Sequence, residues 1–172
     1  RNGKISCVIA KSGWLEFYSD KKPILKEYYR GFGNANEHSP SMKFHAREFK
    51  AVSGNDYSIT ARFESQDGEK IFGMGQYQQP ELDLKGCVLE LAQRNSQISV
   101  PFYLSNKGYG FLWNNAGIGE VMFGKNYTQW RSKLSEELDY WITADDTPKA
   151  IMENYTEVVG RAPEFPENAL GL

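Results

Sequence analysis

Residues 57–64 read Tyr57-Ser58-Ile59-Thr60-Ala61-Arg62-Phe63-Glu64, and this stretch decides the fold class. Apolar and polar side chains alternate along it. Because successive side chains of a β-strand point to opposite faces of the sheet, Tyr57, Ile59, Ala61 and Phe63 share one face. The pattern predicts a strand with one face toward a core, which is typical of an antiparallel sandwich.

Segments of similar character recur along most of the chain. Short apolar and aromatic segments recur, separated by Gly, Asn, Asp, Ser and Pro. We therefore expect a mainly-β domain, an antiparallel two-sheet β-sandwich, with the turn-rich segment 31–40 as a surface connection. The expected strands are 4–10, 13–19, 23–29, 42–51, 57–64, 71–75, 86–93, 98–105, 109–114, 119–123, 127–133 and 138–143.

One helix is expected near the C-terminus. Thr147-Pro148 is typical of an N-cap followed by proline at the first helical position, and Gly160 is placed to end the helix. Asp145 and Asp146 are interpreted as capping residues near the positive helix end. An apolar stripe at helical spacing comprises Ala150, Ile151, Tyr155, Val158 and Val159.

Composition excludes several classes of protein. The 172 residues carry a net charge of -2 without a dense basic run, so no nucleic-acid partner is expected. No stretch approaches the roughly 20 apolar residues of a membrane span, so no membrane partner is expected either. The start, Arg1-Asn2-Gly3-Lys4, is neither an initiator Met nor a signal peptide, which suggests a trimmed N-terminus.

Cysteine and histidine usage gives no cofactor or metal site. Cys7 and Cys87 lie far apart in apolar runs, so we expect two buried thiols rather than a disulfide. Free thiols suit a reducing compartment, and we therefore expect a cytoplasmic protein. His38 and His45 are expected on a surface loop and a strand face, without the spacing of a zinc site.

Three stretches carry the most specific signal, and they occur in a fixed order. The first is Ile71-Phe72-Gly73-Met74-Gly75-Gln76. The second runs from Val100-Pro101-Phe102 through Gly108-Tyr109-Gly110 to Asn115. The third runs from Leu138-Asp139-Tyr140-Trp141 through Thr147-Pro148 to Gly160-Arg161-Ala162-Pro163 and closes with Ala169-Leu170-Gly171-Leu172.

Taken together, these stretches resemble the region just before the catalytic barrel in family 31 glycoside hydrolases, which act on α-linked sugars. The resemblance implies a galactose-mutarotase-like supersandwich over residues 1–162. It further implies that residues 163–172 are a linker and the truncated first strand of a (β/α)8 barrel.

The glycines of these stretches have a structural interpretation that needs no family. Gly73 and Gly75 permit a sharp turn or a close backbone approach, and Gly108 and Gly110 suit a tight hairpin. A phosphate-binding loop is disfavoured, because a polar loop rather than a helix follows Gly75.

The resemblance also bears on catalysis. Retaining glycosidases need two carboxyl groups about 5 to 5.5 Å apart. In the resembled family both are Asp residues of the barrel, so no catalytic residue is assigned in this chain. We expect an accessory domain of an α-glucosidase or α-xylosidase, packed on the barrel in cis and inactive alone. The alternatives are a stand-alone carbohydrate-binding sandwich and a purely structural domain.

Two segments are candidates for contact with carbohydrate. The loop at 77–85 is rich in amide and aromatic groups, which suit sugar hydroxyls and pyranose faces. The segment 93–96 is similar to one in which relatives carry an Arg-Asp pair, with Asn95 here in place of the Asp. An ordinary solvated hairpin loop is the alternative for the first segment. The candidate residues are Gln76, Tyr77, Gln78, Gln79, Asp83, Arg94 and Asn95.

Tryptophans could also form a sugar platform. Trp113, Trp130 and Trp141 lie in expected strands, however, and we predict a core role for them.

Overall fold

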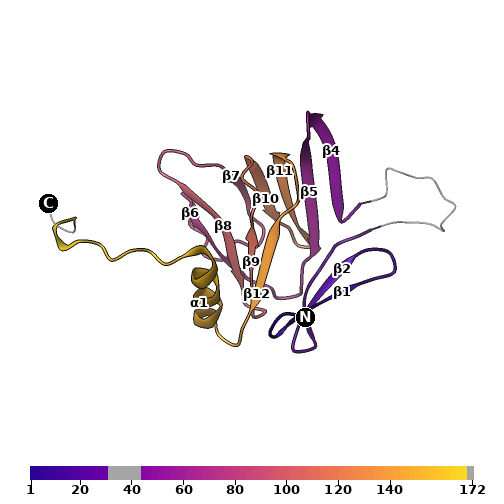
Figure 1. Cartoon of the computed structure of the whole chain (residues 1–172), viewed down its shortest axis with the longest axis horizontal. Coiled ribbons are helices and arrows are strands. Elements are labelled where there is room, and N and C mark those ends of the chain that lie inside the picture. Colours follow the sequence, from indigo (N-terminus) through magenta and orange to yellow (C-terminus); the bar gives the residue numbers. More distant parts are fainter. Residues whose placement is uncertain (31–43, 170–172) are drawn as a thin grey trace.

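The computed structural model describes residues 1–30 and 44–169, and within them short strands are followed by one α-helix (Figure 1). The elements in chain order are β1 (Ile5–Ile9), β2 (Leu15–Ser19), β3 (Lys22–Lys26), β4 (Arg47–Ser53), β5 (Asp56–Glu64), β6 (Ile71–Gln76), β7 (Val88–Leu91), β8 (Ile98–Ser105), β9 (Tyr109–Trp113), β10 (Gly119–Phe123), β11 (Tyr127–Ser135), β12 (Tyr140–Ala144), α1 (Pro148–Val159) and the 3-10 turn η2 (Glu167–Ala169).

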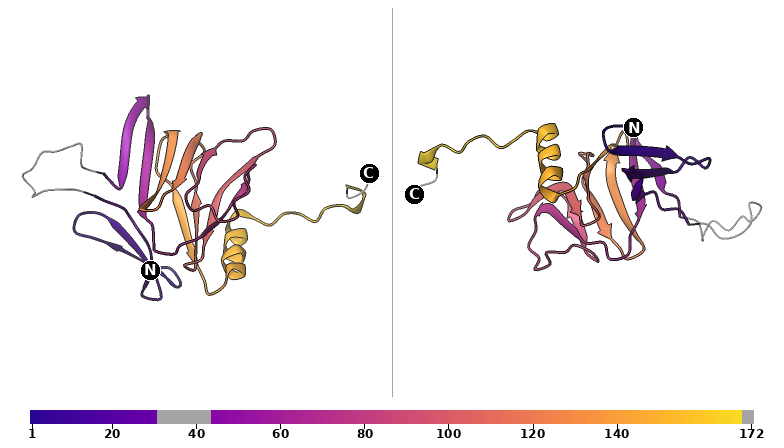
Figure 2. Two further views of the ribbon diagram at one scale, coloured as in Figure 1. Left: turned by 180° about the vertical axis from the view of Figure 1, so that it is seen from behind. Right: turned by 90° about the horizontal axis from the view of Figure 1, so that it is seen from below.

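Two large antiparallel sheets pack face to face. One has the strand order β4-β5-β11-β10-β7 and the other β12-β9-β8-β6. The predicted antiparallel sandwich with one helix is thereby confirmed. The first three strands form a separate sheet, β1-β2-β3, at one end of the sandwich (Figure 2). The sequence did not predict this third sheet, because period-two alternation identifies a strand but not its partner.

An aromatic layer fills the space between the two large sheets. Trp130 of β11 is fully buried and stacks on Phe111 of β9, with ring centroids 5.2 Å apart. It also stacks on Trp113 at 5.5 Å and on Tyr103 of β8 at 6.1 Å. Phe63 of β5 meets Phe111 edge to face at 5.3 Å. Each large ring removes about 150–250 Å² from water, so this layer dominates the energetics of the core.

The alternation of β5 is confirmed by burial. Ile59, Ala61 and Phe63 are each at most 1% exposed, while Tyr57 at the strand's end is 37% exposed. Arg62 lies on the opposite face and donates hydrogen bonds to Gln129 Oε1 at 2.7 Å and to the His45 carbonyl oxygen at 2.7 Å. The outer face of this strand is thus polar.

The three tryptophans separate into two environments. Trp113 and Trp130 are fully buried, which confirms their predicted core role. Trp141 is only half-buried. Its neighbours in β12, Tyr140 and Ile142, pack against the core, so the alternation of the strand turns Trp141 to the outer face. The prediction of a core role for Trp141 was therefore wrong.

The helix begins and ends where the sequence predicted. Thr147 Oγ1 accepts a hydrogen bond from the Ala150 amide at 3.2 Å, and Gly160 follows the last turn with φ 96°. Tyr155 stacks on Phe102 of β8 at 4.0 Å, and this contact seats the helix on the four-stranded sheet. Val158 and Val159, expected on the same apolar stripe, are instead 62% and 48% exposed.

Asp145 and Asp146 do not cap the helix, and that expectation is corrected. Thr147 is the N-cap, and both aspartates precede it. Lys4 Nζ lies 2.9 Å from Asp145 Oδ1 and 2.9 Å from Asp146 Oδ2. This pairing ties the start of the chain to the segment that leads into α1. The hydrogen bond from Lys4 is the main reason that the pKa of Asp145 lies below its ordinary value.

The cysteine prediction was half right. Neither Cys7 nor Cys87 is in a disulfide, but Cys7 is exposed and Cys87 is half-buried. Cys7 lies in β1, which pairs with β2 at the edge of the small sheet, so the apolar run around it is only partly covered. His45 is exposed, just before β4, rather than on a strand face. His38 and the expected turn segment 31–40 lie outside the described residues.

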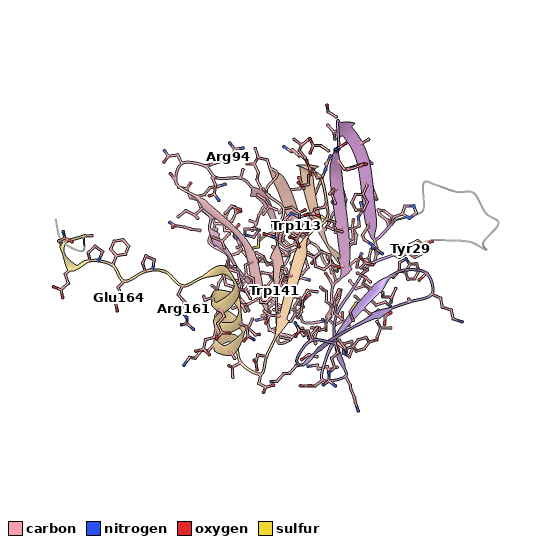
Figure 3. All side chains as sticks on the ribbon, in the orientation of Figure 1. Tyr29, Arg94, Trp113, Trp141, Arg161 and Glu164 are labelled. Atoms are coloured by element: carbon pink, nitrogen blue, oxygen red, sulfur yellow. The ribbon has the colours of Figure 1, made fainter. Side chains whose placement is uncertain are left out.

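The chain after α1 is extended and leaves the sandwich (Figure 3). Residues 161–166 have no regular secondary structure, and Glu167–Ala169 form a single 3-10 turn. The sequence predicted the start of a strand near this point. Residues 170–172 lie outside the described residues, so the truncated barrel strand stays a prediction.

We predict that the Lys4 pairing makes a pH-dependent contribution to stability. A carboxyl group whose pKa is depressed in the folded state stabilises that state above its unfolded pKa and loses the effect as pH falls through the folded value. Lys4→Met should therefore lower the melting temperature at neutral pH, and the difference from the parent should shrink below about pH 4. Thermal melts at both pH values measure it.

Lys50→Met serves as the control, because Lys50 is an exposed lysine on β4, remote from Asp145. A Lys4→Met effect of equal size at neutral and acidic pH would contradict the role assigned to this pairing.

Candidate functional site

A β-bulge in β6 shapes the start of the candidate loop. The register of β6 against β8 shifts between Gly73 and Gly75, and Met74 adopts φ 70° with its side chain fully buried. Gly75 has φ 94°, and a Cβ there would collide with the Ile98 carbonyl oxygen and the Val100 nitrogen. The structural interpretation of this Gly-Met-Gly segment is confirmed: it brings two backbones together and turns Met74 into the core.

The loop that follows is anchored at both ends. Tyr77 donates from its hydroxyl to the Glu90 carbonyl oxygen at 2.9 Å and lies 2.8 Å from Ser99 Oγ. Asp83 Oδ1 accepts from the Ile71 amide at 3.0 Å and from the Lys85 amide at 3.1 Å. These two candidates therefore hold the loop itself together. Burial is the main reason that the pKa of Tyr77 lies above its ordinary value.

The anchors also separate the candidates in space. Asp83 binds Ile71, at the first residue of β6, whereas Gln76 is the last residue of that strand. At about 3.3 Å per residue the two ends of β6 lie roughly 15 Å apart. The loop thus runs back along β6, and Asp83 does not share a site with Gln76.

A tight turn joins β7 to β8 beside the Gln76 end of β6. Ser96 has φ 71°, and the Gln97 amide donates to the Arg94 carbonyl oxygen at 3.3 Å. Arg94 donates two hydrogen bonds, each 2.7 Å, to the carboxylate of Glu90. Asn95 is exposed at the tip. Arg94 marks this end of the sandwich in Figure 3.

Glu90 connects the two candidate segments. Its carboxylate holds Arg94, and its carbonyl oxygen accepts from Tyr77. The hydrogen bond from Arg94 is the main reason that the pKa of Glu90 lies below its ordinary value. The structure therefore brings together Gln76, Tyr77, Arg94 and Asn95 at one end of the sandwich.

Sequence reasoning missed Glu90 and Ser99 at this end, and it placed Gln93 in the candidate segment 93–96 without assigning it a role. Glu90 orients Arg94, and the Gln93 amide group clamps Ser99 by donating to its carbonyl oxygen at 2.8 Å and accepting from its nitrogen at 3.0 Å. The sequence held one partial signal for the first of these, because Glu90 and Arg94 carry opposite charges four residues apart. No local pattern could have paired Gln93 with Ser99.

Two surface pockets are lined by residues of the two candidate segments. One, of about 330 Å³, is lined by Gln93 and Ser99, with Pro101 and Trp113 supplying apolar wall. The second, of about 360 Å³, is lined by Gln76, Tyr77 and Gln79, with Leu82 at its rim. Gln78 is exposed on the loop. Amides beside apolar and aromatic surface can bind a neutral polyol such as a sugar.

Two carboxylates are deeply buried, and both have structural partners. Glu69 Oε1 accepts from Ser105 Oγ at 2.7 Å and from the Tyr109 hydroxyl at 2.7 Å, while Lys85 Nζ lies 3.2 Å from Oε2. Glu27 pairs with Arg47 Nε at 3.0 Å, and burial raises the pKa of its carboxyl group. These contacts stabilise the fold and give neither group access to a substrate.

Within residues 1–30 and 44–169, no group of three or more His, Cys, Asp or Glu side chains could hold a metal ion. The same residues include no helix that is long and apolar enough to cross a membrane.

Comparison with known proteins identifies the family. A model described as the glycosyl hydrolase 31 N-terminal galactose mutarotase-like domain matches residues 1–121. An uncharacterized family 31 glucosidase of Pseudescherichia vulneris is 49% identical, over 100% of this chain and 34% of that protein. Alpha-xylosidase A of Aspergillus niger is 30% identical, over 99% of this chain and 24% of that protein.

Solved structures agree with the sequence relatives. A family 31 α-xylosidase from a soil metagenome, crystallised with xylose, matches with a TM-score of 0.89 and 49% identity, over 99% of this chain and 26% of that one. The chain belongs to the N-terminal galactose-mutarotase-like domain family of glycoside hydrolase family 31. It spans about a third or less of the length of these relatives and corresponds to an accessory domain of such proteins.

We predict that the bulge in β6 is intolerant of any side chain at position 75. Gly75→Ala should destabilise the domain by about 2–4 kcal/mol, because positive φ and a backbone collision both oppose the new methyl group. Gly86→Ala is the matched control: Gly86 has the same φ of 94° but no atom within 4 Å of the added Cβ. It should cost about 1 kcal/mol.

Urea denaturation of both variants measures the difference. Equal losses of stability would mean that backbone conformation alone, and not the close approach to β8, requires glycine at position 75.

Proposed function

We propose that this chain is the non-catalytic N-terminal domain of a retaining α-glycosidase that hydrolyses α-xylosides or α-glucosides. The catalytic carboxylates then belong to a following (β/α)8 barrel. In this proposal residues 1–162 form the sandwich domain, and 163–172 form the linker and the first barrel strand. The free thiols Cys7 and Cys87 support a reducing, cytoplasmic location.

The match to a family 31 α-xylosidase over 99% of this chain, with a TM-score of 0.89, carries the proposal. Relatives from Saccharolobus solfataricus and Aspergillus niger are also named alpha-xylosidases, which favours α-xylosides as the substrate class. The partners of Glu27 and Glu69 support the assignment of catalysis to another domain, because neither carboxylate is free to act as a nucleophile or an acid.

The domain's own contribution to substrate binding comes from the end that holds Arg94 and Asn95. Glu90 fixes the Arg94 side chain with two hydrogen bonds, which leaves the exposed Asn95 amide free to donate to or accept from a sugar hydroxyl. An amide makes a weaker bond than the carboxylate that relatives carry there, because it lacks charge assistance. Gln76, Gln78 and Gln79 offer further amides nearby, whereas Tyr77 and Asp83 act by holding the loop.

Hydrolysis assays test whether catalysis belongs to a part of the full-length protein outside these 172 residues. The full-length protein should release xylose or glucose from α-linked substrates, and the 172-residue chain should release none. Release of sugar by the 172-residue chain alone would contradict the proposal. Calorimetry of that chain with maltose, isomaltose and xylosyl-glucose should give no heat of binding; measurable affinity would favour a stand-alone carbohydrate-binding module.

We predict that Asn95 contributes to substrate binding in the full-length enzyme. Asn95→Ala should reduce kcat/KM for the preferred substrate about 2- to 12-fold, as loss of one neutral hydrogen bond does. Asn126→Ala is the matched control, because Asn126 is also exposed. It lies in the turn between β10 and β11, at the end of these strands opposite to the turn that holds Asn95. Steady-state kinetics of both variants measure the effect.

An equal kcat/KM for Asn95→Ala, Asn126→Ala and the parent would remove Asn95 from the substrate site. It would leave the accessory-domain assignment intact.

A further inference from the structure

One edge of the five-stranded sheet has no partner strand among the described residues. β4 is the last strand in the order β4-β5-β11-β10-β7, and β5 is its only neighbour there. The β4–β5 hairpin extends beyond the rest of the sandwich (Figure 1). Every residue of β4 is exposed except Glu48, which is half-buried. An unpaired edge of this kind can add another strand through backbone hydrogen bonds.

The hydrogen bonds of β5 show which backbone groups of β4 point outward. The Arg62 amide donates to the carbonyl oxygen of Ala46, the residue just before β4, at 2.8 Å. Residues of an antiparallel strand alternate between those that bond to a given neighbour and those that do not. The even-numbered residues of β4 therefore bond to β5. The residues whose N–H and C=O groups point away from β5 are Arg47, Phe49 and Ala51.

These outward groups are complementary to an antiparallel copy of the same strand. A two-fold axis at Phe49 places Phe49 opposite its own copy and Arg47 opposite Ala51. Each such pair can exchange both of its N–H···O=C hydrogen bonds, because all three residues have them free on that side. The register irregularity between Ala51 and Ser53 ends the regular pairing after Ala51.

The charges of β4 favour this axis over its neighbours. With the axis at Phe49, Glu48 lies opposite Lys50 of the second copy, and Lys50 lies opposite Glu48. Both are non-hydrogen-bonded pairs, in which side chains approach most closely. An axis shifted by one residue places Glu48 opposite Glu48 or Lys50 opposite Lys50. Like charges directly opposite each other destabilise a strand pair.

Both charged groups are available for these contacts. Arg62 Nη1 donates to Glu48 Oε1 and holds the carboxylate on the outer face, while Oε2 has no donor among the described residues. Lys50 is exposed and pairs with no carboxylate in residues 1–30 and 44–169. In the monomer, replacement of Lys50 removes no such contact, so the effect of a Lys50 variant on association is an effect on the dimer.

An aromatic pair adds apolar surface beside the axis. Phe49 and Tyr57 lie on the inner face of the sheet, yet they are 51% and 37% exposed. Their rings meet edge to face with centroids 6.1 Å apart. The two-fold axis brings Phe49 of each copy together, so pairing through the edge covers apolar surface that the monomer leaves in water.

We propose that β4 pairs with β4 of a second copy of this chain, antiparallel and centred on Phe49, so that two five-stranded sheets become one continuous sheet. The occupant follows from the charge pattern, because Glu48 and Lys50 complement themselves under a two-fold axis. The inference does not depend on the proposed catalytic assignment.

Disulfide cross-linking tests the register in full-length protein whose native cysteines are replaced by serine. Phe49→Cys places two thiols across the axis, where hydrogen-bonded residues have Cα atoms about 5.5 Å apart, within the range that a disulfide spans. Oxidised glutathione should therefore link most chains into dimers on a non-reducing gel. Ala51→Cys is the matched control, because Ala51 is exposed on the same strand and face but its copy lies about 14 Å away.

A charge reversal tests the pairing of Glu48 with Lys50. Lys50→Glu, added to the Phe49→Cys protein, should slow cross-linking about tenfold, because it places two carboxylates opposite each other on both sides of the axis. Lys125→Glu is the matched control: Lys125 is also exposed but lies in the turn between β10 and β11, at the other end of the sheet from the β4–β5 turn. It should leave the rate unchanged.

Three outcomes would overturn the inference. Folded Phe49→Cys protein that stays monomeric shows that a second copy does not occupy this edge, with circular dichroism as the check on folding. Equal cross-linking at positions 49 and 51 shows random collision rather than a fixed register. Cross-linking at position 49 that Lys50→Glu and Lys125→Glu slow equally contradicts the charge pairing on which the register rests.

Discussion

The aromatic layer between the two large sheets is the constraint on which the rest of the structure depends. Trp130 from the five-stranded sheet is stacked on Phe111 and Trp113 from the four-stranded sheet, and all three are fully buried. Rings of this size must interdigitate in one arrangement, because interiors are packed as densely as organic crystals. That arrangement fixes the relative position of the sheets, and with it the sandwich ends and outer faces.

The functional features follow from that geometry. Once the core residues of each strand face inward, alternation places charges on one outer face and apolar residues on the other. The same packing sets β6 against β8, so that Gln76 and the turn at Arg94 and Asn95 meet at one end. The proposed substrate contacts of this domain therefore lie at the loop ends, while the buried carboxylates, exemplified by Glu69, maintain the fold.

Local patterns predicted much of the fold. Alternation identified the strands, and the Thr147-Pro148 pair identified the start of the helix, because both signals act between near neighbours. The sequence could not reveal the pairing of Lys4 with Asp145, since 141 residues separate them. It also could not show that the candidate loop runs back along β6, so that Asp83 lies at the opposite end of this strand from Gln76. Long-range packing decides such contacts, and a single sequence does not encode them locally.

Native-state hydrogen exchange tests the central role of the aromatic layer most directly. Amides in β5 and β11 should open with the same free energy as amides in β8 and β9, because neither sheet keeps its core without the other. Trp130→Ala should lower both values together, by about 3–5 kcal/mol. If one sheet kept its protection while the other lost it, the two sheets would be independent and the account would be wrong.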